Sequence, residues 1–107
     1  MTLERVVITG VGALSALGAG ADANFSAALN GQSGIGPLQL PFERQRPATP
    51  AAQIRTALPD LIKRAEAPLF DRYALLGWAA ASEALAQAGL SADADADAVL
   101  RDSSGVF

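Results

Sequence analysis

The chain contains no cysteine and no histidine among its 107 residues. Without cysteine it can form no disulfide, no zinc–thiolate site and no thiol nucleophile. Without histidine it lacks the side chain that most often serves as a general base or a metal ligand. We therefore expect no metal site and no bound cofactor within these residues.

Other nucleophiles are also poorly supported by the sequence. Lys63 is the only lysine, and its neighbours Arg64 and Glu66 indicate a polar turn, whereas a low-pKa lysine needs burial. The serines considered as nucleophiles stand in no Gly-x-Ser-x-Gly elbow, and these are Ser15, Ser33, Ser103 and Ser104. We therefore assign no catalytic residue.

The chain has a small net charge and no long uninterrupted apolar run. The net charge of −3 provides no electrostatic footprint for nucleic acid. The N-terminus has no basic start followed by an apolar core, and Ser82, Glu83 and Gln87 interrupt the longest apolar helix candidate. With 50% hydrophobic residues, the sequence predicts a globular cytoplasmic protein without a membrane span or a nucleic-acid partner.

The opening of the chain combines a β-branched run with glycines. Val6, Val7 and Ile8 follow one another without polar alternation, which is typical of a strand buried on both faces of a parallel sheet. Gly10 and Gly12 then allow a sharp turn or a close backbone approach. The pattern predicts an α/β fold in which a buried strand leads into a glycine turn.

The same stretch begins like a dinucleotide-binding fingerprint. Its third glycine position holds Ser15, the next helix is expected only near Ala21, and no acidic residue follows at the required distance. A nucleotide-binding turn and a purely structural βα turn both remain open at this point.

A first helix is predicted from Asp22 to about Asn30, with Gly31 as its C′ residue. Its expected sheet-facing residues share helical spacing and are Phe25, Ala28 and Leu29. Glycines and prolines predict a loop from residue 32 to 50. A short strand over 52–56 and a short helix over 59–64 follow.

The strongest helix is predicted from Tyr73 to Ala88, after a break at Pro68. Asp71 is placed to cap it, and Gly89 followed by Leu90 predicts a Schellman stop. A narrow stripe along this helix consists of Leu76, Ala80, Ala84 and Ala88. Its alanines permit close approach to another helix or sheet.

The C-terminal part carries two further patterns. Asp93, Asp95 and Asp97 invite a calcium-loop interpretation, but the glycine and glutamate of an EF-hand loop are missing. A solvated acidic loop accounts for them better. Residues 103–107 resemble the start of a second core strand, near Ser104, and a chain ending there suggests part of a larger protein.

Four stretches together resemble the β-ketoacyl-acyl-carrier-protein synthases, the condensing enzymes of fatty acid and polyketide assembly. The first is Arg5 to Gly18 (RVVITGVGALSALG), and the second is Asn24 to Ile35, which ends in Gly-x-Ser-Gly-Ile. The third and fourth are Phe70 to Tyr73 and the alanine-rich run Ala79 to Leu90. Their order and spacing agree with that family over nearly the whole chain.

The resemblance implies the N-terminal part of a thiolase-like fold, incomplete in this chain. It implies decarboxylative condensation of acyl and malonyl thioesters by the complete protein, with a cysteine and two histidines that are absent here. The residues carried over are therefore structural, namely Thr9, Gly10, Gly12, Asp71 and Arg72. Asp71 is expected to cap its helix while Arg72 pairs elsewhere, such as across a subunit interface.

The resemblance also implies partners. An acyl carrier protein would meet basic residues near Lys63 and Arg64, although Ala65 to Leu69 depart from the family's basic pattern there. A homodimer or heterodimer of ketosynthase-like subunits is expected, with apolar surface of this chain covered by other parts of the protein or by a second subunit. A non-catalytic partner resembling a chain-length factor is the alternative, and a nucleotide-binding βα domain is the remoter one.

Overall fold

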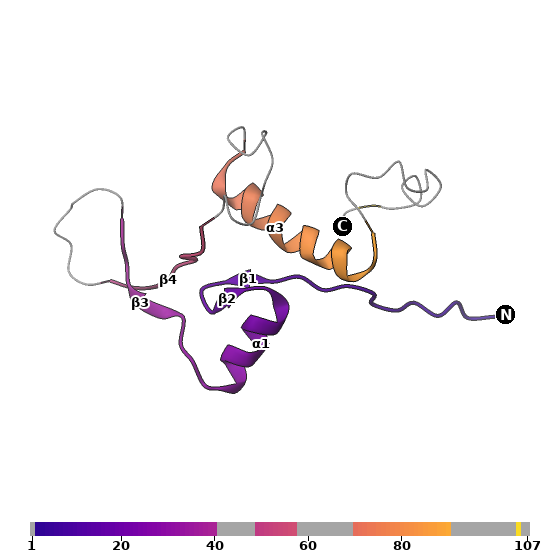
Figure 1. Ribbon diagram of the computed structural model, residues 1–107, viewed down its shortest axis with the longest axis horizontal. Helices are drawn as coiled ribbons and strands as arrows, with labels where there is room; N and C mark the ends of the chain where they lie inside the picture. Colours follow the sequence, from indigo (N-terminus) through magenta and orange to yellow (C-terminus); the bar gives the residue numbers. More distant parts are fainter. Residues whose placement is uncertain (1, 41–48, 58–69, 91–104, 106–107) are drawn as a thin grey trace.

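The computed structural model describes residues 2–40, 49–57, 70–90 and 105. In chain order its elements are β1 (Leu14–Ser15), β2 (Gly18–Ala19), α1 (Ala21–Leu29), β3 (Ile35–Pro37), β4 (Pro50–Ala52) and α3 (Arg72–Gln87). Figure 1 shows α3 on one side of the opening segment and α1 on the other. The described part therefore combines helices and strands, which confirms the α/β class.

The strands form two short antiparallel hairpins. Leu14 pairs with Ala19 across β1 and β2, and Gly36 pairs with Ala51 across β3 and β4. The amide of Leu38 continues the second hairpin by donating to the carbonyl of Thr49 at 2.8 Å. The parallel sheet that the sequence indicated is absent from the described residues, because each strand pairs with a segment near it in the chain.

Two local expectations fail at the second hairpin. The stretch from 32 to 50 was predicted as loop but contains β3, and the strand expected over 52–56 shares only Ala52 with β4. Pro37 and Pro50 face each other in the register, and since each lacks an amide hydrogen, the ladder here is short. The prolines thus limit the length of β3 and β4 but do not prevent these strands from pairing.

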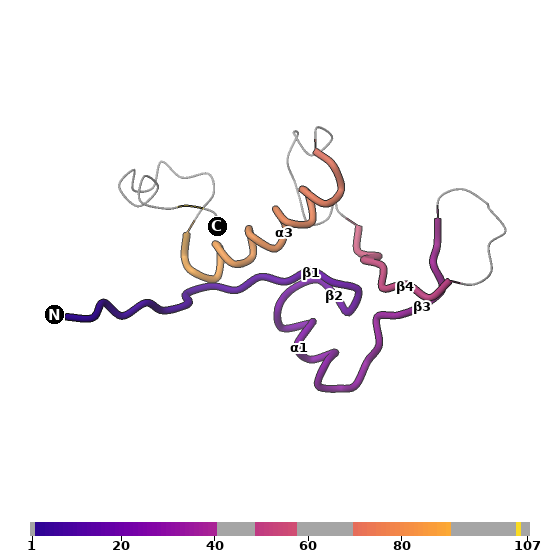
Figure 2. The backbone as a smooth tube through the Cα atoms, turned by 180° about the vertical axis from the view of Figure 1, so that it is seen from behind, coloured from indigo at the N-terminus to yellow at the C-terminus, as the bar shows by residue number. Residues whose placement is uncertain are grey.

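The predicted buried strand at Val6–Ile8 is wrong for the described structure. Val6 is 94% exposed and Ile8 is 85% exposed, and neither lies in a strand. A strand needs a neighbouring backbone to complete its hydrogen-bond ladder. In both views the opening segment begins beyond the end of α3 and then runs along this helix (Figure 2). The backbone amides and carbonyls of a helix are bonded within the helix, so α3 cannot form a strand ladder with the opening segment.

Both helices match their predicted bounds closely and end as predicted. After α1, Gly31 has φ +66° and the amide of Gln32 donates to the carbonyl of Ala27 at 2.9 Å. After α3, Gly89 has φ +75° and the amide of Leu90 donates to the carbonyl of Leu85 at 2.8 Å. Each is a Schellman motif with glycine in the left-handed conformation that L-residues avoid.

The expected face of α1 is also corrected. Phe25 and Leu29 are 66% and 71% exposed, whereas Ala27 is the one buried hydrophobic residue in the described part. Ala23 approaches Gly18 of the hairpin, where an added Cβ would lie 3.4 Å from the Ala23 Cβ. Helix α1 therefore packs against the β1–β2 hairpin through small residues, because the described residues form no broad sheet beneath it.

Several predicted features lie outside the described residues. These are the short helix over 59–64, the acidic residues Asp93, Asp95 and Asp97, and the strand expected to begin near Ser104, of which only Gly105 is described. Among the described residues no helix is long and apolar enough to cross a membrane. Within the same ranges no three acidic, cysteine or histidine side chains gather as a metal site would require.

Candidate functional site

The glycines of the opening segment lie directly against the backbone of α3. A Cβ built on Gly10 would lie 2.0 Å from the carbonyl oxygen of Ala84, and one on Gly12 would lie 1.8 Å from that of Ala80. No real Cβ tolerates such contacts, so only glycine fits at either position. The alanine stripe predicted along this helix is therefore a surface of close approach, but its neighbour is the opening segment and not the helix or sheet that the sequence indicated.

This packing explains the two glycines without a nucleotide. The Cβ position of each glycine is filled by backbone atoms of α3, so close packing already accounts for the absence of a side chain there. Helix α1 begins at Ala21, well after the glycines, so its N-terminus does not open at them as the fingerprint requires. The geometry favours the structural interpretation of the turn.

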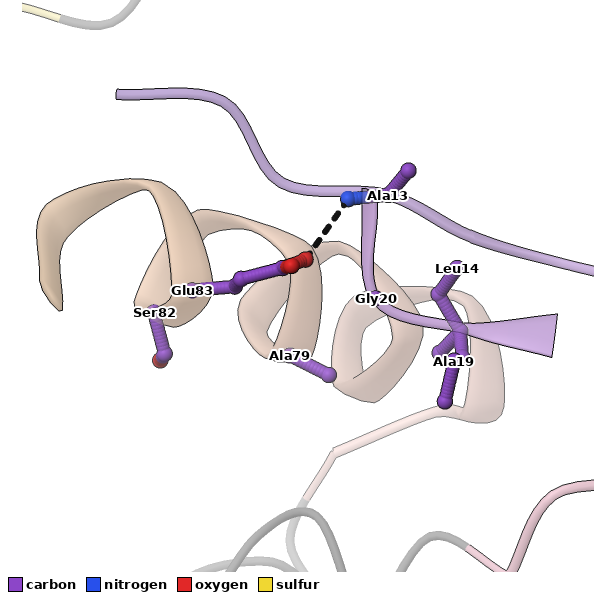
Figure 3. A pocket seen from close by; sticks show the side chains of 7 residues that line it. All are labelled: Ala13, Leu14, Ala19, Gly20, Ala79, Ser82 and Glu83. Atoms are coloured by element: carbon purple, nitrogen blue, oxygen red, sulfur yellow. Dashed lines mark hydrogen bonds between the residues drawn. The ribbon is translucent and has the colours of Figure 1, made fainter. Parts of the chain in front are cut away.

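Glu83 of α3 joins three segments with one carboxylate. Its Oε2 accepts a hydrogen bond from the amide of Ala13 at 2.9 Å (Figure 3), and its Oε1 accepts one from the amide of Ala21 at 2.7 Å. The two donors flank the β1–β2 hairpin, whose base is closed by the bond from the Gly20 amide to the Ala13 carbonyl at 2.8 Å. The carboxylate thus fastens the hairpin and the start of α1 to α3.

These bonds lower the pKa of Glu83 from its ordinary value. The amide of Ala21 contributes most and the amide of Ala13 next, whereas partial desolvation acts in the opposite direction. Hydrogen bonds donated to the ionised form favour that form. Glu83 therefore carries its negative charge at neutral pH.

Gln87 lies one turn beyond Glu83 and makes a parallel contact. Its Oε1 accepts a hydrogen bond from the amide of Val11 at 2.6 Å. The spacing of four residues places both polar side chains on one face of α3, beside the alanines that receive Gly10 and Gly12. In the sequence, Glu83 and Gln87 stood out only as polar interruptions of the longest apolar helix candidate. Their signal was the i, i+4 spacing next to a small-residue stripe.

Asn24 is a second residue that sequence analysis missed. Its Nδ2 donates to the carbonyls of Gly18 at 2.9 Å and Gly20 at 2.7 Å, and its Oδ1 accepts a hydrogen bond from the Ser15 hydroxyl. The Ser15 Oγ also accepts a bond from the Leu17 amide at 3.1 Å. One amide side chain in α1 therefore satisfies the inner carbonyls of the hairpin.

A hollow of about 430 Å³ lies between the hairpin and α3. Its lining consists of Ala13, Leu14, Ala19, Gly20, Ala79, Ser82 and Glu83 (Figure 3). Both oxygens of Glu83 are engaged by backbone amides, so the carboxylate is not placed to serve Ser82 as a base. The lining of this hollow is therefore better suited to packing against an apolar group than to catalysing a reaction.

A second hollow of about 290 Å³ lies between the hairpin turn, β3 and the residues that follow β4. Here Gly34 meets Ala16 so closely that an added Cβ would lie 2.8 Å from the Ala16 Cβ. Arg55 is the charged residue in its lining, and its guanidinium donates to the carbonyl of Pro37 at 3.3 Å. Gly34 of the Gly-x-Ser-Gly stretch thus serves close packing, as the opening glycines do, whereas nothing lies within 4 Å of the Cβ position of Gly31.

The start of α3 corrects one expectation and sharpens another. Asp71 occupies the N-cap position with extended backbone, but its side chain makes no capping hydrogen bond. The Arg72 guanidinium donates to the carbonyl of Ile54 at 2.7 Å. The ring of Phe70 meets that of Trp78 with centroids 5.9 Å apart. Arg72 therefore has its partner elsewhere, as expected, but within this chain. At the start of α3 the Phe70–Trp78 ring contact is present, whereas the capping hydrogen bond expected from the Asp71 side chain is not.

The comparison with known families decides the affiliation. The family described as "Beta-ketoacyl synthase, N-terminal domain" matches residues 3–107. The chain belongs to the β-ketoacyl synthase family. The resemblance stated from four short stretches is thereby confirmed over almost the full length.

Two relatives of this ketosynthase segment have curated descriptions. Nodulation protein E of Rhizobium sp. (strain N33) is 40% identical over 90 residues, which are 84% of this chain and 22% of that protein. Nodulation protein E of Rhizobium leguminosarum bv. trifolii is 37% identical over 90 residues, with the same shares. The chain therefore spans about a fifth of the length of these curated relatives.

The structural residues carried over from the ketosynthase resemblance do not gather in one place. Gly10 and Gly12 lie on the later part of α3, whereas Asp71 and Arg72 stand at its start. Thr9 is exposed. Lys63 and Arg64, proposed for carrier-protein docking, lie outside the described residues. The site that the structure does assemble is the contact of residues 10–13 and 21 with α3.

Proposed function

We propose that this chain forms the N-terminal scaffold of a β-ketoacyl synthase of fatty acid or polyketide assembly. The reaction is the decarboxylative condensation of an acyl thioester with a malonyl thioester. The observation that carries the proposal is the family match over residues 3–107. The thiolase-like fold that the family resemblance implies is part of the same proposal.

The chemistry sets requirements that this chain does not meet alone. The condensation needs a nucleophile to hold the acyl group and donors that stabilise the enolate formed when malonyl thioester loses carbon dioxide. The chain has neither cysteine nor histidine, and the Glu83 carboxylate is occupied by two backbone amides. We assign those catalytic groups to other parts of the complete protein and expect residues 1–107 to be inactive by themselves.

A scaffold role is supported by how the described residues use their polar groups. Glu83, Gln87 and Asn24 all bind backbone atoms of the opening segment or the hairpin. These contacts give the glycine segment a defined position on α3. In the complete enzyme that position would orient the first element of the sheet.

The proposed partners follow from the same function. An acyl carrier protein would deliver the thioesters, with Lys63 and Arg64 as the candidate docking residues. A second ketosynthase-like subunit would complete a homodimer or heterodimer. These partners and the cytoplasmic location remain predictions.

A condensation assay with acyl and malonyl carrier-protein thioesters tests the proposal. We expect no product from residues 1–107 and product when the polypeptide that follows residue 107 in the gene is supplied together with them. The matched control replaces the nucleophilic cysteine of the added polypeptide by alanine and should abolish the product. Turnover by residues 1–107 alone would contradict the scaffold role.

The same experiment separates the enzyme from a non-catalytic partner subunit. If the following polypeptide has another residue at the cysteine position, no product is expected until a second, cysteine-bearing subunit is added. That outcome would overturn the assignment of condensation to this protein and favour the chain-length-factor alternative.

A further inference from the structure

Helix α1 lacks a side-chain cap of its own. Its N-cap residue is Gly20, with φ +101° and ψ +146°, and no side chain of α1 bonds its first amides. The first amides of a helix have no partner within the helix and carry its positive end charge. The amide of Ala21, the first residue of α1, instead donates to Glu83 Oε1 at 2.7 Å.

A carboxylate from another helix thus occupies the place of a cap. Capping residues usually stand next to the helix in sequence, whereas Glu83 and Ala21 are separated by 62 positions. The other oxygen of Glu83 holds Ala13 at 2.9 Å, on the far side of the hairpin. One ionised group therefore satisfies two backbone amides and lies at the positive end of α1, and both effects stabilise its negative charge.

We propose that Glu83 is a positioning residue whose carboxylate caps α1 from outside and thereby holds the β1–β2 hairpin against α3. This inference is independent of the condensation proposed above. It concerns how the opening 21 residues are fixed, whatever reaction the complete protein performs.

Other charges do not account for the contact. No described residue forms an ion pair with Glu83, whose partners are the two amides. The charged or titratable side chains on the elements packed around it are Glu4 and Arg5 of the opening segment, Asp22 of α1, and Arg72 and Tyr73 of α3. Arg72 and Tyr73 lie at the opposite end of α3, at least ten residues or about 15 Å along the axis.

The sign of the pH dependence follows from the lowered pKa of Glu83, which its two amide partners cause. A carboxyl group whose pKa is lowered by folding stabilises the folded state above its unfolded pKa. That contribution disappears as the pH falls through the lower folded value. The hairpin should therefore stay docked at neutral pH and loosen only in acid.

A pH titration of the full chain, followed by nuclear magnetic resonance of the backbone amides, tests the proposal without any substitution. The amides of Ala13 and Ala21 should move through one shared transition with a midpoint below the ordinary glutamate pKa. Independent midpoints, or no movement of either amide, would overturn the proposal.

Two variants complete the test. Glu83→Gln keeps the size of the side chain but leaves one acceptor oxygen and no charge, so the shared transition should vanish. Amide exchange at Ala13 or Ala21 should then rise by on the order of tenfold. Asp22→Asn removes an exposed carboxylate from the first turn of α1 and should leave the transition in place. Persistence of the transition in Glu83→Gln, or its loss in Asp22→Asn, would contradict the role of Glu83.

Discussion

Two neighbouring parts of the opening segment behave in opposite ways. Residues 6–8 carry bulky apolar side chains, yet Val6 and Ile8 are among the most exposed residues described. Within residues 10–13 the two glycines carry no side chain, yet Gly10 and Gly12 lie against the backbone of α3 and the Ala13 amide is bound by Glu83. What fixes the opening of this chain is close backbone contact and hydrogen bonding, not apolar bulk.

The physical reason lies in the surface that α3 presents. A helix face of Ala80, Ala84 and Ala88 allows another backbone to approach closely, and Glu83 and Gln87 beside it accept hydrogen bonds from that backbone. Bulky side chains gain nothing there, because burial of apolar area requires a partner of matching shape. The comparison therefore predicts that small changes at residues 10–13 matter more than large changes at residues 6–8.

The largest effect is expected from Gly12→Ala. Its Cβ would meet the Ala80 carbonyl at 1.8 Å, so the segment must shift away from α3, at a cost of about 3 kcal/mol of unfolding free energy. Denaturant unfolding followed by the fluorescence of Trp78, the single tryptophan, measures it. Gly77→Ala is the matched control: nothing lies within 4 Å of its Cβ position, so it should stabilise α3 by about 1 kcal/mol. Equal effects of the two would contradict the close-packing account.

Asn24→Ala should come next, with a loss of about 2 kcal/mol, because it removes the side-chain donor to the Gly18 and Gly20 carbonyls and the acceptor of the Ser15 hydroxyl. Denaturant unfolding again measures the change. Ser26→Ala, an exposed position on the same helix, serves as the control and should be near neutral. A neutral Asn24→Ala would mean that the hairpin does not depend on α1.

Gln87→Ala removes the neutral acceptor of the Val11 amide and should cost about 1 kcal/mol. The loss should be the same at pH 7 and pH 4, since a carboxamide does not titrate in this range. Unfolding measured at both pH values checks this, with the exposed Gln32→Ala as control. A loss that grows or shrinks with pH would show that Gln87 acts through Glu83.

Val6→Ser should have the smallest effect, less than about 0.5 kcal/mol, because the side chain is 94% exposed. A loss above about 1 kcal/mol in the same unfolding measurement would show that Val6 is buried in solution. That result would restore the strand predicted from the sequence and reverse the contrast between residues 6–8 and 10–13.

The sequence allowed some features of the structure to be predicted and not others. The bounds of α1 and α3 and their glycine stops were predicted from local composition and capping residues, and they are confirmed. The candidate site was predicted in part: Gly10 and Gly12 were recognised as positions of close approach. Their partner, and the roles of Glu83, Gln87 and Asn24, were not recognised. The i, i+4 spacing of Glu83 and Gln87 beside the alanines is a local signal, but it does not identify the distant amides that these side chains bind.

The family affiliation was also predicted from the sequence, because four short motifs in the expected order can be recognised without coordinates, and the family match confirms it. Helix ends were determined in the same way, since a Schellman motif involves bonds across six consecutive residues and a glycine that tolerates positive φ. Only the tertiary structure decided the rest. Whether Val6–Ile8 becomes a strand depends on the presence of a second backbone with which it can pair. The hydrogen bonds from the amides of Val11, Ala13 and Ala21 to Glu83 and Gln87 join groups that are 62 to 76 positions apart. Such contacts depend on how separate elements meet in space, which no local pattern in the chain encodes.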